Sequence, residues 1–216
     1  MVKISREDFI RKATPFFPPE ALNFAYFQFD THHFHFHIVP PRKTKKGDFK
    51  YFRVKGKTPT ITVNSDLCSY DFLLVYLHEV AHYIVYKHYN MARVKSHGEE
   101  WKHFFRLLIE NLTDQVDLPE DIKTAYLRHS KKIMSSTVLD RELELTLDKY
   151  RSKPANVLYL HDLKIGDVFI CRNKIFRVDY FARTRARCTL LKNNKRYLIS
   201  GMMNVEKYPS EQFTEK

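Results

Sequence analysis

The stretch His78-Glu79-x-x-His82 is the feature that most constrains this chain. Residues four apart lie on one face of an α-helix, so a helix would point both imidazoles at the same metal ion. Glu79 would then lie close enough to that ion to hold and deprotonate a bound water, which is the chemistry of a zinc hydrolase. The alternative is a core helix with two hydrogen-bonded histidines and no metal.

The surrounding residues favour a buried helix over residues 69–89, with Ser69 or Asp71 able to cap its start. Apolar residues recur at helical spacing and give this helix a broad hydrophobic face. They are Leu73, Leu74, Leu77, Val80, Ala81, Ile84 and Val85. A zinc-binding helix in the core of a small domain has this pattern.

A catalytic zinc usually has three protein ligands, and His88 is the first candidate for the third. It stands six residues after His82, as in the metzincin pattern H-E-x-x-H-x-x-G-x-x-H. That pattern needs glycine where the chain leaves the helix, and this chain has Val85 there. A β-branched residue favours a continuing helix, which puts His88 on another face.

His97 is the better candidate, because a polar connection over residues 90–96 precedes it and Gly98 follows it. An amphipathic helix then begins, whose apolar face comprises Trp101, Phe104, Phe105, Leu108, Ile109 and Leu112. A ligand at the start of a second helix that packs on the first would complete the site. Glu99, Glu100 or Glu110 remains the rival ligand in a thermolysin-like arrangement.

The residues before the motif predict two helices and a small sheet. We expect helices over 5–13 and 19–28 and strands over 31–38, 49–54 and 60–64, which form an antiparallel sheet. Phe34, Phe36 and Ile38 should face the core, with His33, His35 and His37 facing outward. A second metal site at these histidines is disfavoured, because side chains two apart on a strand lie about 6.5 Å apart. An edge strand of this sheet would bind an extended peptide by main-chain hydrogen bonds.

The chain carries a net charge of +12, and most of the excess lies near its end. Residues 151–216 hold 14 Lys and Arg against 6 Asp and Glu, a net charge of +8. This asymmetry suggests a polyanionic partner, nucleic acid first, although a solvated surface would look the same.

The three cysteines, Cys68, Cys171 and Cys188, are isolated, which fits a reducing cytoplasm and excludes a cysteine zinc ribbon. Residues 1–6 do not resemble a signal peptide, and no run of 18 apolar residues exists. We therefore expect a cytoplasmic protein without a membrane partner, at the nucleoid if it binds DNA.

Residues 157–216 read as a small basic β-barrel of the SH3-like kind, after candidate helices over 119–128 and 137–150 and a linker over 151–156. Its candidate nucleic-acid residues are Arg183, Arg185 and Arg187 on one strand face, and Lys192, Lys195 and Arg196 at a neighbouring hairpin. Phe181 and Tyr197 would be stacking rings. Basic residues with aromatic rings suit single-stranded or irregular nucleic acid, and the alternative is a barrel that only buttresses the first domain.

The two motifs together resemble the SprT-like (Spartan) metalloprotease family. The resemblance rests on His78-Glu79-x-x-His82, a connection of fourteen residues, and His97-Gly98-x-x-Trp101, where the family usually has phenylalanine in place of Trp101. It covers about residues 20–113, and the chain looks like a bacterial type without the cysteine zinc ribbon. The resemblance implies that His78, His82 and His97 bind zinc, that Glu79 is the general base, and that the substrates include DNA-bound proteins.

The sequence therefore predicts an α+β protein: a minimal zincin over residues 1–150, then the barrel over 157–216. We expect a zinc-dependent endopeptidase that acts on DNA-associated proteins, with Zn²⁺ as cofactor. A non-catalytic nucleic-acid-binding protein with a structural zinc site is the second hypothesis. A protease with substrates unrelated to DNA is the third.

Overall fold

The computed structural model describes residues 4–52, 57–89, 91, 94–132, 140–151, 158–182 and 185–208. The chain divides into two compact units, Met1–Arg151 and Ser152–Lys216, and each is described by itself. Among the described residues, no helix has the length and apolar character needed to cross a bilayer.

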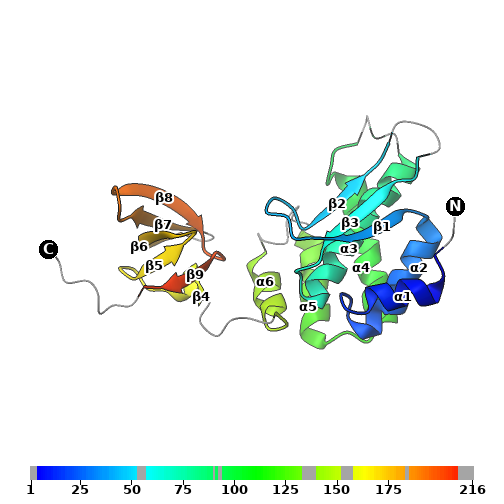
Figure 1. Cartoon of the computed structure of the whole chain (residues 1–216), viewed down its shortest axis with the longest axis horizontal. Coiled ribbons are helices and arrows are strands. Elements are labelled where there is room, and N and C mark those ends of the chain that lie inside the picture. The colour runs from blue at the N-terminus through cyan, green and yellow to red at the C-terminus, as the bar shows by residue number, and fades with distance from the viewer. Residues whose placement is uncertain are drawn as a thin grey trace. The chain divides into compact units, whose positions relative to one another are not determined.

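The first unit contains a three-stranded sheet of order β1-β3-β2 (Figure 1). Its strands are β1 (His35–Val39), β2 (Gly47–Lys50) and β3 (Thr60–Asn64). β2 pairs with β3 antiparallel, but β1 pairs with β3 parallel, so the predicted antiparallel sheet is wrong. β3 is the strand whose Ile61 and Val63 are fully buried. It therefore takes the central place between β1 and β2.

The predicted alternation is confirmed within β1, but the predicted start of the strand at Thr31 is wrong, because α2 continues to His32 and His33 is its C-cap residue. Phe34, Phe36 and Ile38 belong to the hydrophobic core or pack against it. His35 and His37 are exposed, with their ring centroids 6.3 Å apart. These histidines therefore form a solvent-facing strand surface.

Helices precede and follow this sheet. They are α1 (Arg6–Ala13), the short 3-10 helix η1 (Pro19–Ala21), α2 (Leu22–His32), α3 (Ser69–His88), α4 (Glu99–Gln115), α5 (Glu120–Lys132) and α6 (Arg141–Asp148). Ser5 caps α1 through its hydroxyl, which accepts a hydrogen bond from the Asp8 amide at 3.1 Å. The predicted side-chain cap of α3 is wrong: Cys68 is the N-cap residue without such a bond, and Asp71 instead binds Lys46 and Arg151. Residues 137–139, the start of the last predicted helix, lie outside the described residues.

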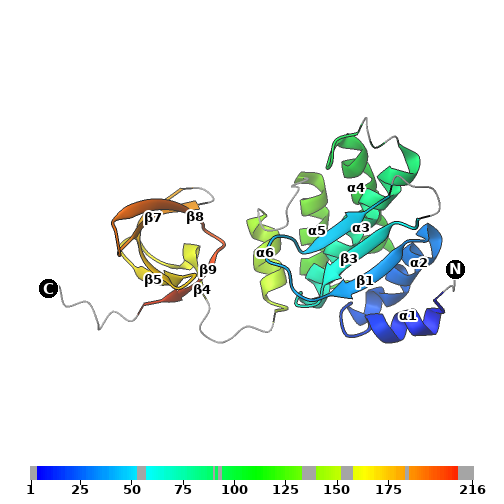
Figure 2. The ribbon, with the colours of Figure 1, turned by 45° about the horizontal axis from the view of Figure 1, so that its top comes forward.

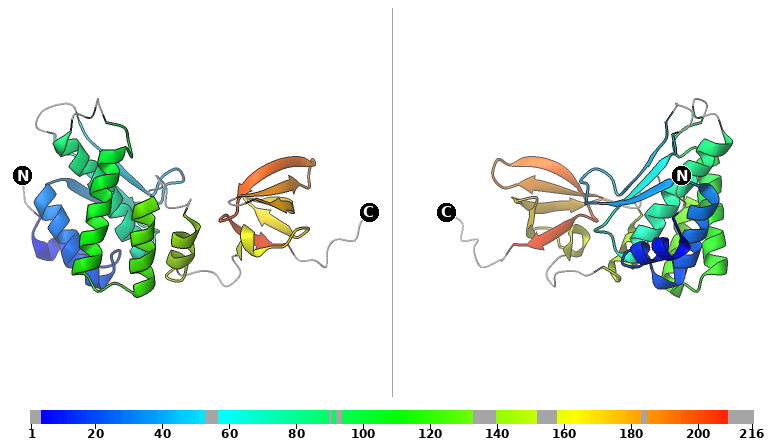
Figure 3. Two further views of the ribbon diagram at one scale, coloured as in Figure 1. Left: turned by 180° about the vertical axis from the view of Figure 1, so that it is seen from behind. Right: turned by 45° about the vertical axis from the view of Figure 1, so that its right-hand side comes forward.

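α3 is the central element of the first unit. It contacts β2 and β3 on one side and α4 on another, and α4 contacts α5 in turn. Figures 1 and 3 show the sheet and the helices α3 to α5 as two layers from opposite directions. Because the sheet covers one side of α3 and α4 covers another, most α3 residues are buried. This burial explains the long apolar face of its sequence.

The second unit is a six-stranded antiparallel sheet of order β4-β9-β5-β6-β7-β8. The strands are β4 (Leu158–Tyr159), β5 (Val168–Cys171), β6 (Lys174–Phe181), β7 (Arg185–Leu190), β8 (Lys195–Ser200) and β9 (Asn204–Lys207). A short 3-10 helix, η3 (Leu160–Asp162), follows β4. The sheet curls around a core that includes Phe169, Phe176 and Val178 (Figure 2).

The predicted SH3-like barrel is not closed, because β4 and β8 do not pair within the part of the chain that the structure describes. Closure would require hydrogen bonds between these two edge strands. β4 has only two residues, and the first four residues of β8 are exposed on both faces. β8 therefore lacks the buried inner face that a barrel strand needs.

Candidate metal centre

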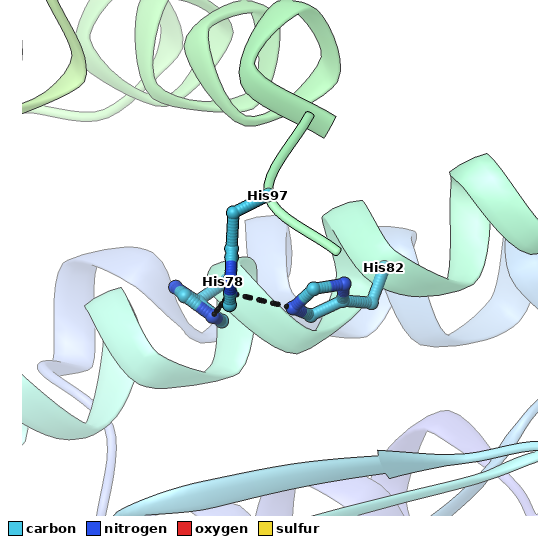
Figure 4. Close-up of side chains that lie close together, drawn as sticks. All are labelled: His78, His82 and His97. Carbon is cyan, nitrogen blue, oxygen red and sulfur yellow. Dashed lines mark hydrogen bonds between the residues drawn. The ribbon is translucent and has the colours of Figure 1, made fainter. Parts of the chain in front are cut away.

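Three histidines meet beside the central helix. His78 and His82 project from α3, and His97 reaches them from the loop before α4 (Figure 4). The Nε2 atom of His97 lies 3.0 Å from Nε2 of His78 and 3.0 Å from Nε2 of His82. Tetrahedral zinc with Zn–N bonds of about 2.0–2.1 Å separates its nitrogens by about 3.3 Å. The donor set and its spacing therefore fit a zinc ion.

The helix fixes two of these ligands, and burial prepares them for a metal. His78 and His82 are four residues apart on α3 and so share one face. Burial lowers the pKa of His78 well below its ordinary value, and nearby His82 and His97 lower it further. Burial and His97 lower the pKa of His82 to about 3. The rings are consequently neutral, which is the form that binds a metal.

His97 is placed by a strained turn. Its φ is 58°, in the left-handed region that a non-glycine residue rarely adopts. The amide of Gly98 donates to the carbonyl of Lys95 at 2.9 Å, and Gly98 is the N-cap residue of α4. The turn therefore directs the imidazole back toward α3 immediately before α4 begins.

Trp101 supports the site from the first turn of α4. Its indole Nε1 donates to the backbone carbonyl of His78 at 3.3 Å. Its ring centroid lies 4.6 Å from those of both His78 and His97, and Phe105 stacks on its other side at 4.9 Å. Trp101 is only 1% exposed, so it packs the two histidines from the protein interior.

The rival third ligands lie elsewhere. His88 stacks on Phe104 at 5.7 Å, on another face of α3. Glu99 is exposed and pairs with Lys102 at 2.8 Å. Among the described residues, the group that could hold a metal comprises the three histidines and includes none of the three candidate glutamates.

Glu79 lies under β2, on the same helix as His78 and His82. Its side chain is largely buried, with 7% of the residue exposed. Burial raises its pKa to about 8, assisted by Asp48 and opposed by Arg42, Lys45 and a hydrogen bond from the Phe49 amide. A divalent cation between the imidazoles would lower this pKa again, because an opposite charge favours the carboxylate. Glu79 then has the charge state that a base needs.

Gly47 and Phe49 also lie at this site, and sequence reasoning missed both. A Cβ atom on Gly47 would lie 2.5 Å from Oε1 of Glu79 and 2.6 Å from Cγ1 of Val75. Only glycine allows β2 to approach α3 this closely. The Phe49 ring lies parallel to that of His82, with centroids 6.4 Å apart and an interplanar angle of 6°. No local sequence pattern indicates that Gly47 and Phe49 lie over α3.

The predicted nucleic-acid residues divide between the two faces of the second sheet. Arg185 and Arg187 are exposed on one face of β7, called here the arginine face. Arg196 joins it from β8 opposite Thr189, whereas Lys195 stands opposite the core residue Leu190 on the other face. Arg183 lies outside the described residues.

Different aromatic and basic residues complete the arginine face. Phe181 stacks on His161 at 5.4 Å, and Tyr197 packs edge-on against Phe176 at 5.7 Å, so neither ring is on this face. Tyr180 is on it, 53% exposed, with the guanidinium of Arg187 5.8 Å from its ring centroid. Arg177 also belongs to this face, since it pairs across the sheet with Thr189. Sequence reasoning missed both.

A comparison with protein families finds a match within the first unit. The model of the SprT-like family matches residues 20–121, a range that contains all three histidines and Glu79. Searches of curated proteins and of solved structures gave no match. The family match and the three-histidine geometry therefore concern the same segment of the chain.

Proposed function

Residues 20–121 are a SprT-like family domain, and from this premise we propose that the protein is a zinc-dependent endopeptidase. The observation that carries the proposal is the convergence of three Nε2 atoms at α3, the helix that also carries the buried Glu79. His78, His82 and His97 would hold the ion. Three neutral imidazoles leave a fourth tetrahedral position open, as catalytic zinc sites require.

The chemistry divides between the ion and Glu79. A zinc ion held by the three imidazoles would act as a Lewis acid: it would polarise the scissile carbonyl and lower the pKa of a bound water. Glu79 takes a proton from the attacking water and then delivers it to the leaving amine. The helix keeps this carboxylate one residue from a ligand, so the base needs no separate positioning element.

β2 offers a place for the substrate backbone. Within the described sheet it has β3 on one side and no strand on the other. An extended peptide that pairs with this edge would run past the metal site, because Gly47 and Phe49 contact Glu79 and His82. This supports a protein substrate in extended conformation.

The central test compares the wild-type protein with Glu79→Gln, loaded with zinc, on an unfolded protein substrate. We expect cleavage by the wild type, inhibition by a chelator, and a loss of at least about 100-fold in the variant with its zinc content unchanged. Equal proteolysis by the two proteins would refute the assignment of Glu79.

The arginine face supports the finer proposal that the substrates are DNA-associated proteins. It gathers Arg177, Arg185, Arg187 and Arg196 around the exposed ring of Tyr180. Asp179 is the acidic residue at this surface, and its carboxylate already accepts a hydrogen bond from Thr189 at 2.7 Å and lies 3.5 Å from Arg177. Guanidinium groups with a stacking ring suit the phosphates and bases of single-stranded DNA.

DNA binding is tested with a fluorescent single-stranded oligonucleotide at several salt concentrations. We expect Arg185→Ala/Arg187→Ala to weaken binding and to reduce the slope of log K against log salt by about 1.4, for two lost contacts. The matched control is Lys164→Ala/Lys174→Ala, which removes the same charge away from the arginine face. Equal losses in both double variants would indicate attraction by net charge alone.

The same two assays separate the alternative, a non-catalytic nucleic-acid-binding protein with a structural zinc site. That alternative predicts salt-dependent DNA binding, bound zinc and no cleavage of any substrate. A protease with substrates unrelated to DNA predicts the reverse: cleavage that depends on Glu79 and no contribution from the arginine face.

A further inference from the structure

A buried ion cluster joins the start of α3 to α6. Its two most buried anionic members are Asp71 of α3 and Glu144 of α6, which are 1% and 5% exposed, and Asp148 of α6 also lies 3.6 Å from Arg151. Its cations are Lys46, which precedes β2, and Arg151, which follows α6. Buried carboxylates are costly unless they are paired, so this cluster fixes the elements that carry its members.

Both cations contact both carboxylates. Lys46 Nζ lies 2.8 Å from Oδ2 of Asp71 and 3.5 Å from Oε1 of Glu144. Arg151 contacts the same residues at 3.2 Å and 2.8 Å. If one cation is removed, each carboxylate therefore keeps the remaining cation as a partner. The two cations differ in what they hold: Arg151 belongs to the α6 end of the cluster, whereas Lys46 leads directly into β2.

Lys46 is also fixed through its backbone. Its carbonyl accepts a hydrogen bond from the Asn64 amide at 2.9 Å, at the end of β3. The next residue is Gly47, whose close approach to Glu79 leaves no room for a side chain. Two residues further, the Phe49 amide donates to the Glu79 carboxylate. The position of Lys46 thus determines where β2 begins and how closely it passes over Glu79.

We propose that Lys46 is a positioning residue: its ammonium, held by Asp71 and Glu144, fixes β2 over the metal site. The inference rests on the proposed endopeptidase function, and it deepens it. It makes α6, which lies outside the family-matched residues 20–121, part of the support of the active site. β2 carries both a contact to the base and the edge that would bind substrate, so a shift of this strand affects turnover and substrate binding together.

The test uses the full chain with Lys46→Met, Lys46→Arg and the matched control Arg151→Met. Each methionine removes one cation from the same cluster and keeps an unbranched side chain, but only Lys46 is attached to β2. Hydrogen–deuterium exchange of the metal-free proteins reads the position of β2 independently of activity. We expect Lys46→Met to accelerate exchange of residues 47–50 by about tenfold or more, with α3 unchanged. Arg151→Met should leave the exchange of β2 close to that of the wild type. Lys46→Arg keeps the positive charge and should keep β2 protected as well.

Steady-state kinetics of the zinc-loaded proteins complete the test. We expect kcat to fall and KM to rise in Lys46→Met, for a loss of about 10- to 100-fold in kcat/KM at full zinc content. The loss in Arg151→Met should be below about threefold. Identical exchange and kinetics in the two methionine variants would overturn the proposal, because the cluster would then act only on stability. If the wild type cleaves nothing, the endopeptidase function fails, and the exchange contrast still decides whether Lys46 holds β2.

Discussion

The indole of Trp101 donates a hydrogen bond to the backbone carbonyl of His78, 3.3 Å away. The bond joins the first turn of α4 to the ligand-bearing turn of α3, and the same indole packs against the rings of His78 and His97. One buried side chain thus sets the distance between the two segments that carry the three histidines. A metal site built from two segments needs such a contact, because the ligand geometry tolerates errors of only about 0.5 Å.

Replacement of Trp101 separates its packing from its hydrogen bond. Trp101→Phe keeps a buried ring and loses the donor, so we expect a loss of about 1 kcal/mol in the free energy of unfolding and a modest loss of zinc affinity. Trp101→Ala leaves a cavity and should cost about 3–5 kcal/mol. Chemical denaturation of the metal-free proteins measures both values. Equal destabilisation by the two changes would contradict the role given to the ring.

Removal of the third ligand should release the metal. His97→Ala leaves two imidazoles, and we expect zinc affinity to fall by at least about 100-fold, together with the loss of the stabilisation that saturating zinc confers. His88→Ala is the matched control, since His88 packs on Phe104 away from the cluster. Metal analysis after dialysis and the shift in melting temperature with added zinc distinguish the two variants. Retention of a full equivalent of zinc by His97→Ala would show that another residue completes the site.

Zinc affinity should depend weakly on pH in the mildly acidic range. Three histidines with an ordinary pKa near 6.5 would lose about 1000-fold in metal affinity between pH 7.5 and 5.5, because protons compete for each ring. Here burial lowers the pKa of all three, that of His82 to about 3. The metal-free rings are therefore already neutral over most of this range, and metal binding has few protons to displace.

We accordingly expect a loss of about tenfold or less over the same two pH units, mostly from His97, the least buried of the three. Competition titration with a chelator of known affinity at each pH measures it. A loss near the value for unperturbed histidines would mean that the site is open to water in the metal-free protein.

Substitution of Gly47 should damage catalysis more than folding. The added methyl group of Gly47→Ala would meet Oε1 of Glu79 and Cγ1 of Val75, so either β2 or the carboxylate must move. Overpacking of this kind costs about 1–3 kcal/mol of stability. A displacement of the base by about 1 Å costs about 100-fold in rate. We expect kcat/KM to fall by that order while zinc content stays at one equivalent, measured on the same protein substrate.

Gly166→Ala is the comparison for glycine replacement in general. Gly166 has a φ of +92° in the second unit, and no atom would meet its added Cβ within 4 Å. Its replacement strains the backbone without touching the site, and we expect unchanged cleavage. A normal rate in Gly47→Ala would show that β2 does not constrain Glu79.

Local sequence patterns were sufficient for the elements that carry the ligands. The apolar spacing of residues 69–89 specified α3, and helical geometry then placed His78 and His82 on one face. The absence of glycine at Val85 indicated a continuing helix and removed His88 from the site, as α3 shows. The alternation along β1 likewise followed from residues two apart. Each of these inferences depends on neighbours within one element, which is why the sequence alone supported them.

A β-bulge shows where such local reasoning ends. Strict alternation from Phe176 and Val178 places Tyr180 toward the core and Phe181 outward. The pairing of β6 with β7 shifts between Val178 and Tyr180, which turns Tyr180 to the solvent beside Arg187. The extra residue of a β-bulge has no counterpart in the partner strand. Its position therefore depends on how the strand pairs with a distant segment.

The sequence by itself predicted the helix that carries His78 and His82, the choice of His97 as their partner, the α+β character and the basic end of the chain. These follow from periodicity, spacing and composition, which act over a few residues or over the chain as a whole. Only the tertiary structure decided that β3 runs between β1 and β2, that Gly47 and Phe49 cover Glu79, and that Lys46 reaches Asp71 and Glu144. Lys46 and Glu144 are far apart along the chain, and their contact depends on how buried surfaces pack together. No local pattern encodes that packing, because it is selected by the free energy of the whole core.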